Sequence, residues 1–188
     1  KDQSLYAYLK NEGYTDDELK KSALFRFTEK GVSEFFWNRV MFPILNERNK
    51  AIAFGGRVMG DGEPKYLNSQ ETVVFEKSRT LYGLHEARRA REGYLLLCEG
   101  YMDVIAMHQA GFSQAIASLG TAFTPGQAAL IRRYVKDVIL SYDSDDAGVR
   151  AALRNIEILR EAVATQSNRV AREALMRVVP TYHTPEEV

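Results

Sequence analysis

Short apolar runs alternate with helical segments over residues 94–161, and this alternation restricts the fold more than any other sequence feature. The runs are Tyr94–Cys98, Ala115–Ala117 and Val138–Leu140. Helices are predicted over about 102–110, over about 125–134 behind the cap Thr124, and in a long segment ending near 161. Strands that are apolar throughout and are joined by helices are typical of a parallel sheet buried on both faces. This part of the chain is therefore predicted to be an α/β layer.

The chain before this layer has a different texture. The first thirty residues have the pattern of short helices, and Thr15 and Glu18 have the spacing of a capping box. Residues 35–74 contain β-prone runs interrupted by Gly55-Gly56 and Asp61-Gly62, and Asp-Gly favours tight hairpin turns. We therefore predict a mixed, mostly antiparallel subdomain ahead of the parallel sheet.

These patterns predict an α/β chain, α+β overall, with three segments. Residues 1–77 form the mixed N-terminal subdomain, 78–162 form the parallel sheet flanked by helices, and 163–188 form a helical C-terminal piece. The last segment does not supply the next strand that such a sheet requires.

Composition excludes several classes of protein. Lys plus Arg and Asp plus Glu are 25 each, so net charge alone predicts no partner. One cysteine, Cys98, and three histidines exclude a disulfide framework and a Cys/His zinc module. No apolar run approaches the roughly 18 residues of a membrane span. We expect a cytoplasmic protein without a membrane partner, and an inert, buried Cys98 thiol.

Acidic residues follow two of the predicted strands at the point where each ends. Glu99 follows the first run, and Asp143 and Asp145 follow the third. Ligands of open parallel sheets bind outside the carboxyl ends of the strands, so we expect these carboxylates to share one crevice. Carboxylates packed together need a compensating cation, and hard oxygen ligands suit Mg²⁺ or Mn²⁺. Asp103, one helical turn beyond Glu99, is a further candidate ligand.

Helix capping is the alternative explanation of these acidic residues. A carboxylate after a strand often begins the next helix, and for Glu99 this explanation is as good as metal binding. One cap does not account for the three aspartates among residues 143–146, however. The joint pattern favours a metal site, with Asp146 as a capping or solvated residue.

At these positions the chain resembles a known family. The chain is similar to the Toprim fold of bacterial DnaG-type primases in residues 95–112, 117–124 and 138–148. Other classes of Toprim protein share with this fold only the glutamate and the D-x-D pair. Residues 54–72 and 81–88 resemble the segment that precedes Toprim in the primase RNA-polymerase core. The resemblance covers about 28–161 and departs after it, because a further strand and acidic loop are missing. We expect residues to be omitted around 163–166, which leaves the site short of one or two outer carboxylates.

The resemblance implies DNA-dependent synthesis of RNA primers in replication, by nucleotidyl transfer with two Mg²⁺ or Mn²⁺ ions and no zinc in this chain. It implies Glu99, Asp143 and Asp145 as catalytic and metal-binding residues. It also implies a groove for template or nucleotide, formed by Arg57, Lys65, Asn68 and Lys77. For Lys65 and Lys77, a solvated surface position is the alternative.

The expected partners are a single-stranded DNA template, nucleoside triphosphates and an RNA–DNA hybrid. The replicative helicase is expected to bind the full-length protein through a domain that this chain lacks. A monomer is expected. The rival functions are a Toprim nuclease and a non-catalytic DNA-binding Toprim module, neither of which needs the segment 54–72.

Overall fold

The computed structural model describes residues 4–120 and 122–164, and these form two compact units. One unit contains residues 4–44 and 51–76, and the other contains 45–50 and the described residues from 77 onward. The predicted boundary between residues 77 and 78 and the three-segment division stay predictions. The helix expected within 163–188 lies almost entirely outside the described residues.

The first unit begins with two short helices, α1 (Ser4–Asn11) and α2 (Asp16–Lys21). The predicted capping box of α2 is confirmed, because the Thr15 hydroxyl accepts from the Glu18 amide while the Glu18 carboxylate accepts from the Thr15 amide. A hairpin of β1 (Phe25–Thr28) and β2 (Gly31–Glu34) follows. The prediction of helices throughout the first thirty residues was wrong for β1. Its F-R-F-T pattern alternates at strand period over four residues, too few to be distinguished in the sequence.

A three-stranded sheet completes this unit. Its strands are β3 (Arg39–Leu45), β4 (Ala51–Val58) and β5 (Tyr66–Asn68), in the order β3-β4-β5, and β4 pairs with β5 antiparallel. Gly55 and Gly56 lie inside β4 and do not interrupt it, contrary to the prediction. Arg39 packs over Gly56 and donates from Nη1 to its carbonyl oxygen at 3.2 Å, which uses the space that a side chain would take.

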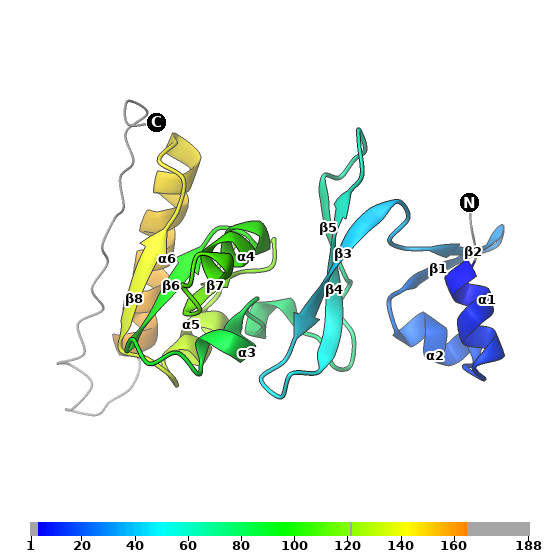
Figure 1. The fold of residues 1–188 in the computed structure, drawn as a ribbon, viewed down its shortest axis with the longest axis horizontal. Helices are drawn as coiled ribbons and strands as arrows, with labels where there is room; N and C mark the ends of the chain where they lie inside the picture. Colours follow the sequence, from blue (N-terminus) through cyan, green and yellow to red (C-terminus); the bar gives the residue numbers. More distant parts are fainter. Residues whose placement is uncertain (1–3, 121, 165–188) are drawn as a thin grey trace. The chain divides into compact units, whose positions relative to one another are not determined.

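The second unit contains the predicted parallel sheet. Its strands are β6 (Tyr94–Cys98), β7 (Ala115–Ala117) and β8 (Asp137–Ser141), all parallel and in the order β7-β6-β8 (Figure 1). The helices α4 (Tyr101–Gln109), α5 (Pro125–Ile131) and α6 (Asp146–Ala164) follow the three strands in turn. The α/β fold class is therefore confirmed.

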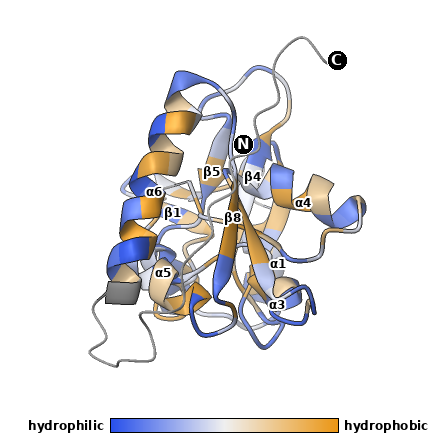
Figure 2. Cartoon of the chain, turned by 90° about the vertical axis from the view of Figure 1, so that its left-hand side faces the viewer, coloured by the Kyte–Doolittle hydropathy of each residue, from blue (hydrophilic) through white to orange (hydrophobic). Residues whose placement is uncertain are grey.

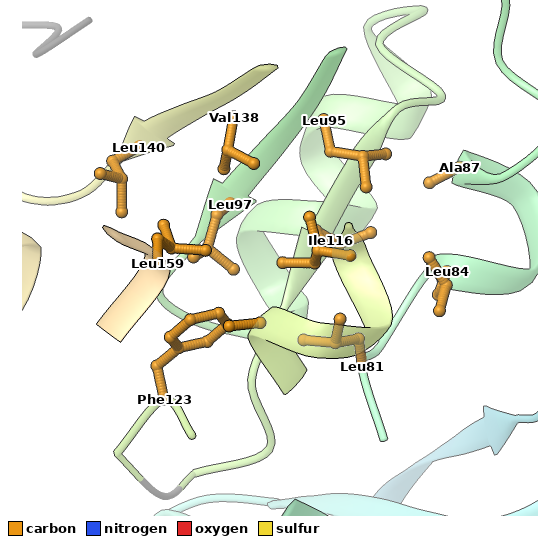
Figure 3. Packing of buried hydrophobic residues seen from close by; sticks show 12 residues of the cluster. Leu81, Leu84, Ala87, Leu95, Leu97, Ile116, Phe123, Val138, Leu140 and Leu159 are labelled. Carbon is orange, nitrogen blue, oxygen red and sulfur yellow. The ribbon is translucent and has the colours of Figure 1, made fainter. Parts of the chain in front are cut away.

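Both faces of this sheet are buried, as the uninterrupted apolar strands predict. Successive strand residues point to opposite faces. Leu95 and Leu97 of β6 enter one cluster together with Leu159 of α6, as Figure 3 shows. Leu96 and Cys98 enter the other cluster, where α4 contributes Val104. Apolar residues run through β8, and α6 carries polar and apolar residues in turn (Figure 2). The sheet thus lies between α4 on one face and α5 and α6 on the other.

The segment before β6 is less helical than its spacing suggests. Leu81, Leu84 and Ala87 are buried together as their spacing predicts, but the helices here are short, η1 (Lys77–Arg79) and α3 (Leu84–Ala87). Gly83 has a φ of 80°, which no continuous right-handed helix allows. Just before it, Tyr82 exchanges two backbone hydrogen bonds with Ala117 of β7.

Among the described helices, none has the length and apolar character needed to cross a membrane. Cys98 is fully buried, and burial raises the pKa of its thiol to about 12. The prediction that this thiol is buried is confirmed, and so high a pKa leaves almost no thiolate at neutral pH.

Candidate active site

The predicted carboxylates lie at the carboxyl ends of two neighbouring strands. In the register of β6 and β8, Cys98 pairs with Ser141, so Glu99 emerges beside the segment of Tyr142 and Asp143. The helix after β6 covers one face of the sheet, and the helix after β8 covers the other. Such a reversal opens a crevice outside the strand ends, the usual ligand position in open α/β sheets. A cavity of about 330 Å³ lies here, and its lining includes Glu99, Asp103, Tyr142 and Asp143.

Glu99 is held in this crevice by the backbone that follows β8. Its Oε1 accepts a hydrogen bond from the Asp143 amide at 3.0 Å. Gly148, which is buried, faces the same oxygen, and a Cβ atom there would lie 2.8 Å from Glu99 Oε1. Partial burial of the carboxylate raises the pKa of Glu99, and the negative charges of Asp143, Asp103 and Asp145 raise it further. Negative charge is therefore concentrated at this site.

Two of the other aspartates begin helices as well as contributing to this charge. Asp145 Oδ1 accepts from the Gly148 amide at 2.7 Å, in the first turn of α6. Asp103 Oδ2 accepts from the Gly100 amide at 2.9 Å, in the first turn of α4. The capping alternative therefore describes Asp103 and Asp145, but not Glu99. Asp103 lines the cavity, whereas Asp145 is not among its lining residues.

The chemistry of these donors fits a divalent cation. All of them are carboxylate oxygens, which Mg²⁺ and Mn²⁺ prefer, and a cation would relieve the charge repulsion that adds to burial in raising the pKa of Glu99. Within residues 4–120 and 122–164, however, no three carboxylate, imidazole or thiol groups converge closely enough to form a ready-made metal centre. Metal binding by Glu99, Asp143, Asp145 and Asp103 stays a prediction.

The predicted basic residues fall into two places. Arg57 of β4 and Lys65, just before β5, are exposed and line one cavity of about 520 Å³ in the first unit. Arg57 pairs with Tyr66 and Gly55 pairs with Asn68, so Arg57 and Asn68 share one face of the sheet. Lys77 lies in η1 of the second unit instead. The structure thus places Arg57 and Lys65 around one cavity and Asn68 on the same sheet face as Arg57, whereas Lys77 belongs to the other unit.

Tyr142 is a cavity residue that the sequence reading did not consider. Its hydroxyl accepts a hydrogen bond from Nδ2 of the buried Asn155 in α6, and burial raises the pKa of the phenol. The only sequence signal was its position between the third apolar run and Asp143. The hydrogen bond ties the end of β8 to α6 beside the carboxylates.

Comparison with known proteins decides the family. Residues 1–88 match the family model for the N-terminal domain of the DNA primase catalytic core, and residues 96–174 match the Toprim-like model. The chain belongs to the DnaG-type primase family. The resemblance inferred from the sequence motifs is therefore confirmed.

Individual DnaG-type relatives extend over most of the chain. It is 47% identical to a DNA primase of Clostridium acetobutylicum over 161 residues, which are 85% of this chain and 27% of that primase. The crystal structure of the zinc-binding and RNA polymerase domains of Aquifex aeolicus primase has a TM-score of 0.80 at 36% identity, with 86% of this chain and 41% of that one covered.

A DnaG primase catalytic domain bound to single-stranded DNA is also similar. It has a TM-score of 0.73 at 43% identity, with 80% of this chain and 49% of that one covered. The chain spans about a quarter of the length of the curated primases that it matches. The carboxylate cavity lies in the Toprim-like segment, and the cavity of Arg57 and Lys65 lies in the segment of the N-terminal core domain.

Proposed function

We propose that the chain is part of the catalytic core of a DnaG-type primase and synthesises RNA primers from ribonucleoside triphosphates on single-stranded DNA. The observation that carries this proposal is the pairing of Glu99 with the Asp143 backbone at adjacent strand ends, within a segment of the DnaG-type family. The presence of the N-terminal core segment supports a primase over a nuclease or a binding module, which have no need of it.

In this proposal the carboxylate cavity is the site of nucleotidyl transfer. Glu99 and Asp143 hold Mg²⁺ or Mn²⁺, with Asp103 and Asp145 as further ligands. When bound, such ions lower the pKa of the attacking 3′-hydroxyl and stabilise negative charge on the leaving pyrophosphate. The Asp143 amide fixes the orientation of Glu99, and the tight approach of Gly148 prevents this carboxylate from moving toward α6.

The basic residues hold the polyanions in this proposal. Arg57 and Lys65 are exposed around one cavity, where guanidinium and ammonium groups can contact phosphates of template or nucleotide. Asn68, on the same sheet face as Arg57, adds neutral hydrogen-bonding groups. Lys77 contacts a further phosphate from the second unit. The binding of single-stranded DNA by a similar DnaG catalytic domain supports this assignment.

One incubation separates the proposed function from its rivals. The chain is mixed with single-stranded DNA, labelled ribonucleotides and Mg²⁺ or Mn²⁺, and the products are separated on a denaturing gel. Labelled oligoribonucleotides that disappear in Glu99→Gln indicate a primase. A shortened template indicates a nuclease, and DNA binding without either product indicates a non-catalytic module. The helicase, the RNA–DNA hybrid, the monomeric state and the cytoplasmic location stay predictions.

A further inference from the structure

Gln127 is a buried polar residue whose hydrogen bonds reach far along the chain. It lies in the first turn of α5 and has no exposed surface. Its Oε1 accepts from the Thr124 amide at 3.1 Å, which completes the capping box of α5. Its Nε2 donates to the carbonyl oxygens of Lys77 and Thr80, both at 2.9 Å. A side-chain amide has two N–H groups, so both donors are used on this remote segment.

Two neighbours of Gln127, Thr124 and Gly126, contact the carbonyl oxygen of Ser78, which lies between Lys77 and Thr80 in the sequence. The Thr124 hydroxyl donates a hydrogen bond to the carbonyl oxygen of Ser78. Gly126 packs against the same carbonyl so closely that a Cβ atom on it would lie 2.7 Å from the oxygen. The first turn of α5 therefore contacts the carbonyl oxygens of Lys77, Ser78 and Thr80. We call this set of contacts the α5 clamp.

The segment held by the α5 clamp is the single 3₁₀ turn η1. It spans Lys77–Arg79, and the Thr80 amide donates to the Lys77 carbonyl at 3.3 Å. The hydrogen-bond geometry of a 3₁₀ turn is poorer than that of an α-helix, so contacts from outside the turn contribute more to its position. The α5 clamp therefore helps to fix the backbone from which the Lys77 side chain leaves.

Helix capping alone does not require this arrangement. A cap needs the Thr124 hydroxyl and the acceptor of residue 127, and a glutamate at residue 127 would serve it equally. Only an amide also supplies two donors to buried carbonyls, which would be costly to leave without partners. The presence of glutamine at residue 127 is therefore explained by its hydrogen bonds to the segment 77–80 and not by the cap.

We propose that Gln127 is a positioning residue that acts through Lys77, holding η1 so that the lysine ammonium meets a phosphate of the template or nucleotide. This inference rests on the proposed function, because it assigns Lys77 a phosphate contact. It predicts energetic coupling between two residues fifty positions apart in sequence, of which only Lys77 touches the ligand.

A double-mutant cycle tests the coupling. The affinity of the chain for a fluorescent single-stranded DNA is measured by anisotropy at several salt concentrations, for Gln127→Met, Lys77→Ala and the double variant. Gln127→Met is expected to raise Kd by roughly three- to tenfold, as coupled neighbours do, and to lower the salt slope as Lys77→Ala does. In the Lys77→Ala background, Gln127→Met is expected to change neither the Kd nor the salt slope.

A lysine of the other unit serves as the matched control. In the Lys65→Ala background, Gln127→Met is expected to raise Kd by the same factor as in the wild type, because the two sites share no contact of the α5 clamp. An equal effect of Gln127→Met on Kd with and without Lys77 would overturn the inference, because the substitution would then act through general destabilisation of the fold.

A second pair of variants covers the case in which Gln127→Met does not fold. Thr124→Val removes the hydroxyl that holds Ser78, and Thr124→Ser keeps it. Only the valine variant is expected to weaken binding, and only when Lys77 is present. If the wild type binds no single-stranded DNA, the proposed function is wrong and the inference is lost with it. If the wild type binds and Lys77→Ala changes nothing, only the inference is overturned.

Discussion

Substitution of Gly148 by alanine tests the geometry of the carboxylate site through the sign of a stability change. Gly148 lies in the first turn of α6, where alanine would ordinarily stabilise the helix by up to about 1 kcal/mol. Here the added Cβ atom would press on the Asp143 carbonyl oxygen and lie 2.8 Å from Glu99 Oε1. Because a backbone carbonyl cannot rotate away, we expect an overpacking cost of about 1–3 kcal/mol, which exceeds the gain in helix propensity.

Subtracting a helix gain of about 1 kcal/mol leaves an expected net loss of up to about 2 kcal/mol, which corresponds to a fall in Tm of up to roughly 8 °C for a chain of this size. The measurement is thermal unfolding followed by circular dichroism, without divalent cations. The matched control is Ala147→Gly, at the exposed neighbouring position of the same helix. In a helix without such contacts, a Gly-to-Ala change raises the Tm and an Ala-to-Gly change lowers it. Here both Gly148→Ala and Ala147→Gly should lower the Tm. A higher Tm in Gly148→Ala would refute the close packing of Gly148 against Asp143 and Glu99.

Three further predictions concern the charged residues. Glu99→Gln keeps the acceptor for the Asp143 amide but should lower primer synthesis roughly 10²-fold or more, and near wild-type activity would contradict the catalytic role. Because the pKa of Glu99 is raised on folding, its stability contribution is present below its ordinary pKa and lost as pH rises through the folded value. Without cations, Glu99→Gln should therefore unfold at a higher Tm than the wild type at pH 7 and at an equal Tm in acid. Asp143→Asn combined with Asp145→Asn should abolish Mn²⁺ binding in calorimetry while the fold persists, and unchanged affinity would remove both residues as ligands. Lys65→Ala should reduce the slope of log affinity for single-stranded DNA against log salt by about 0.7. Arg89, an exposed residue just after α3 to which we assign no phosphate contact, serves as the control, and Arg89→Ala should leave the slope unchanged.

The parallel sheet could be predicted from sequence because its signal is local. Each buried strand is an uninterrupted apolar run, and Thr124-Pro125 marks the start of α5. The structure has β6 and β7 at the predicted residues and extends β8 by one residue at each end. In such strands the side chains on both faces are buried, so the sequence need not show which face of the sheet is exposed.

Elements that depend on distant contacts were harder to predict. The helical spacing of Leu81, Leu84 and Ala87 predicts a helix that ends at Gly93. The structure instead has the one-turn helix α3, because burial against β7 produces the same spacing. Gln127 gave no functional signal, since its partners Lys77 and Thr80 lie 50 and 47 positions away. Tyr142 and Asn155 meet only when α6 folds back on β8.

The carboxylates show why capping and metal binding are poor alternatives to one another. A carboxylate has two oxygens, and the hydrogen bonds at the starts of α4 and α6 each occupy one oxygen, of Asp103 and of Asp145. Capping fixes the rotamer of each side chain and thereby fixes where its second oxygen lies. The charges of Asp103 and Asp145 are thereby held near Glu99, where they add to the effect of burial in raising the pKa of that residue. The same hydrogen bonds that begin the two helices therefore hold in place the charges that a divalent cation would neutralise, so a capping role for an aspartate at this sheet edge is compatible with a role as a ligand.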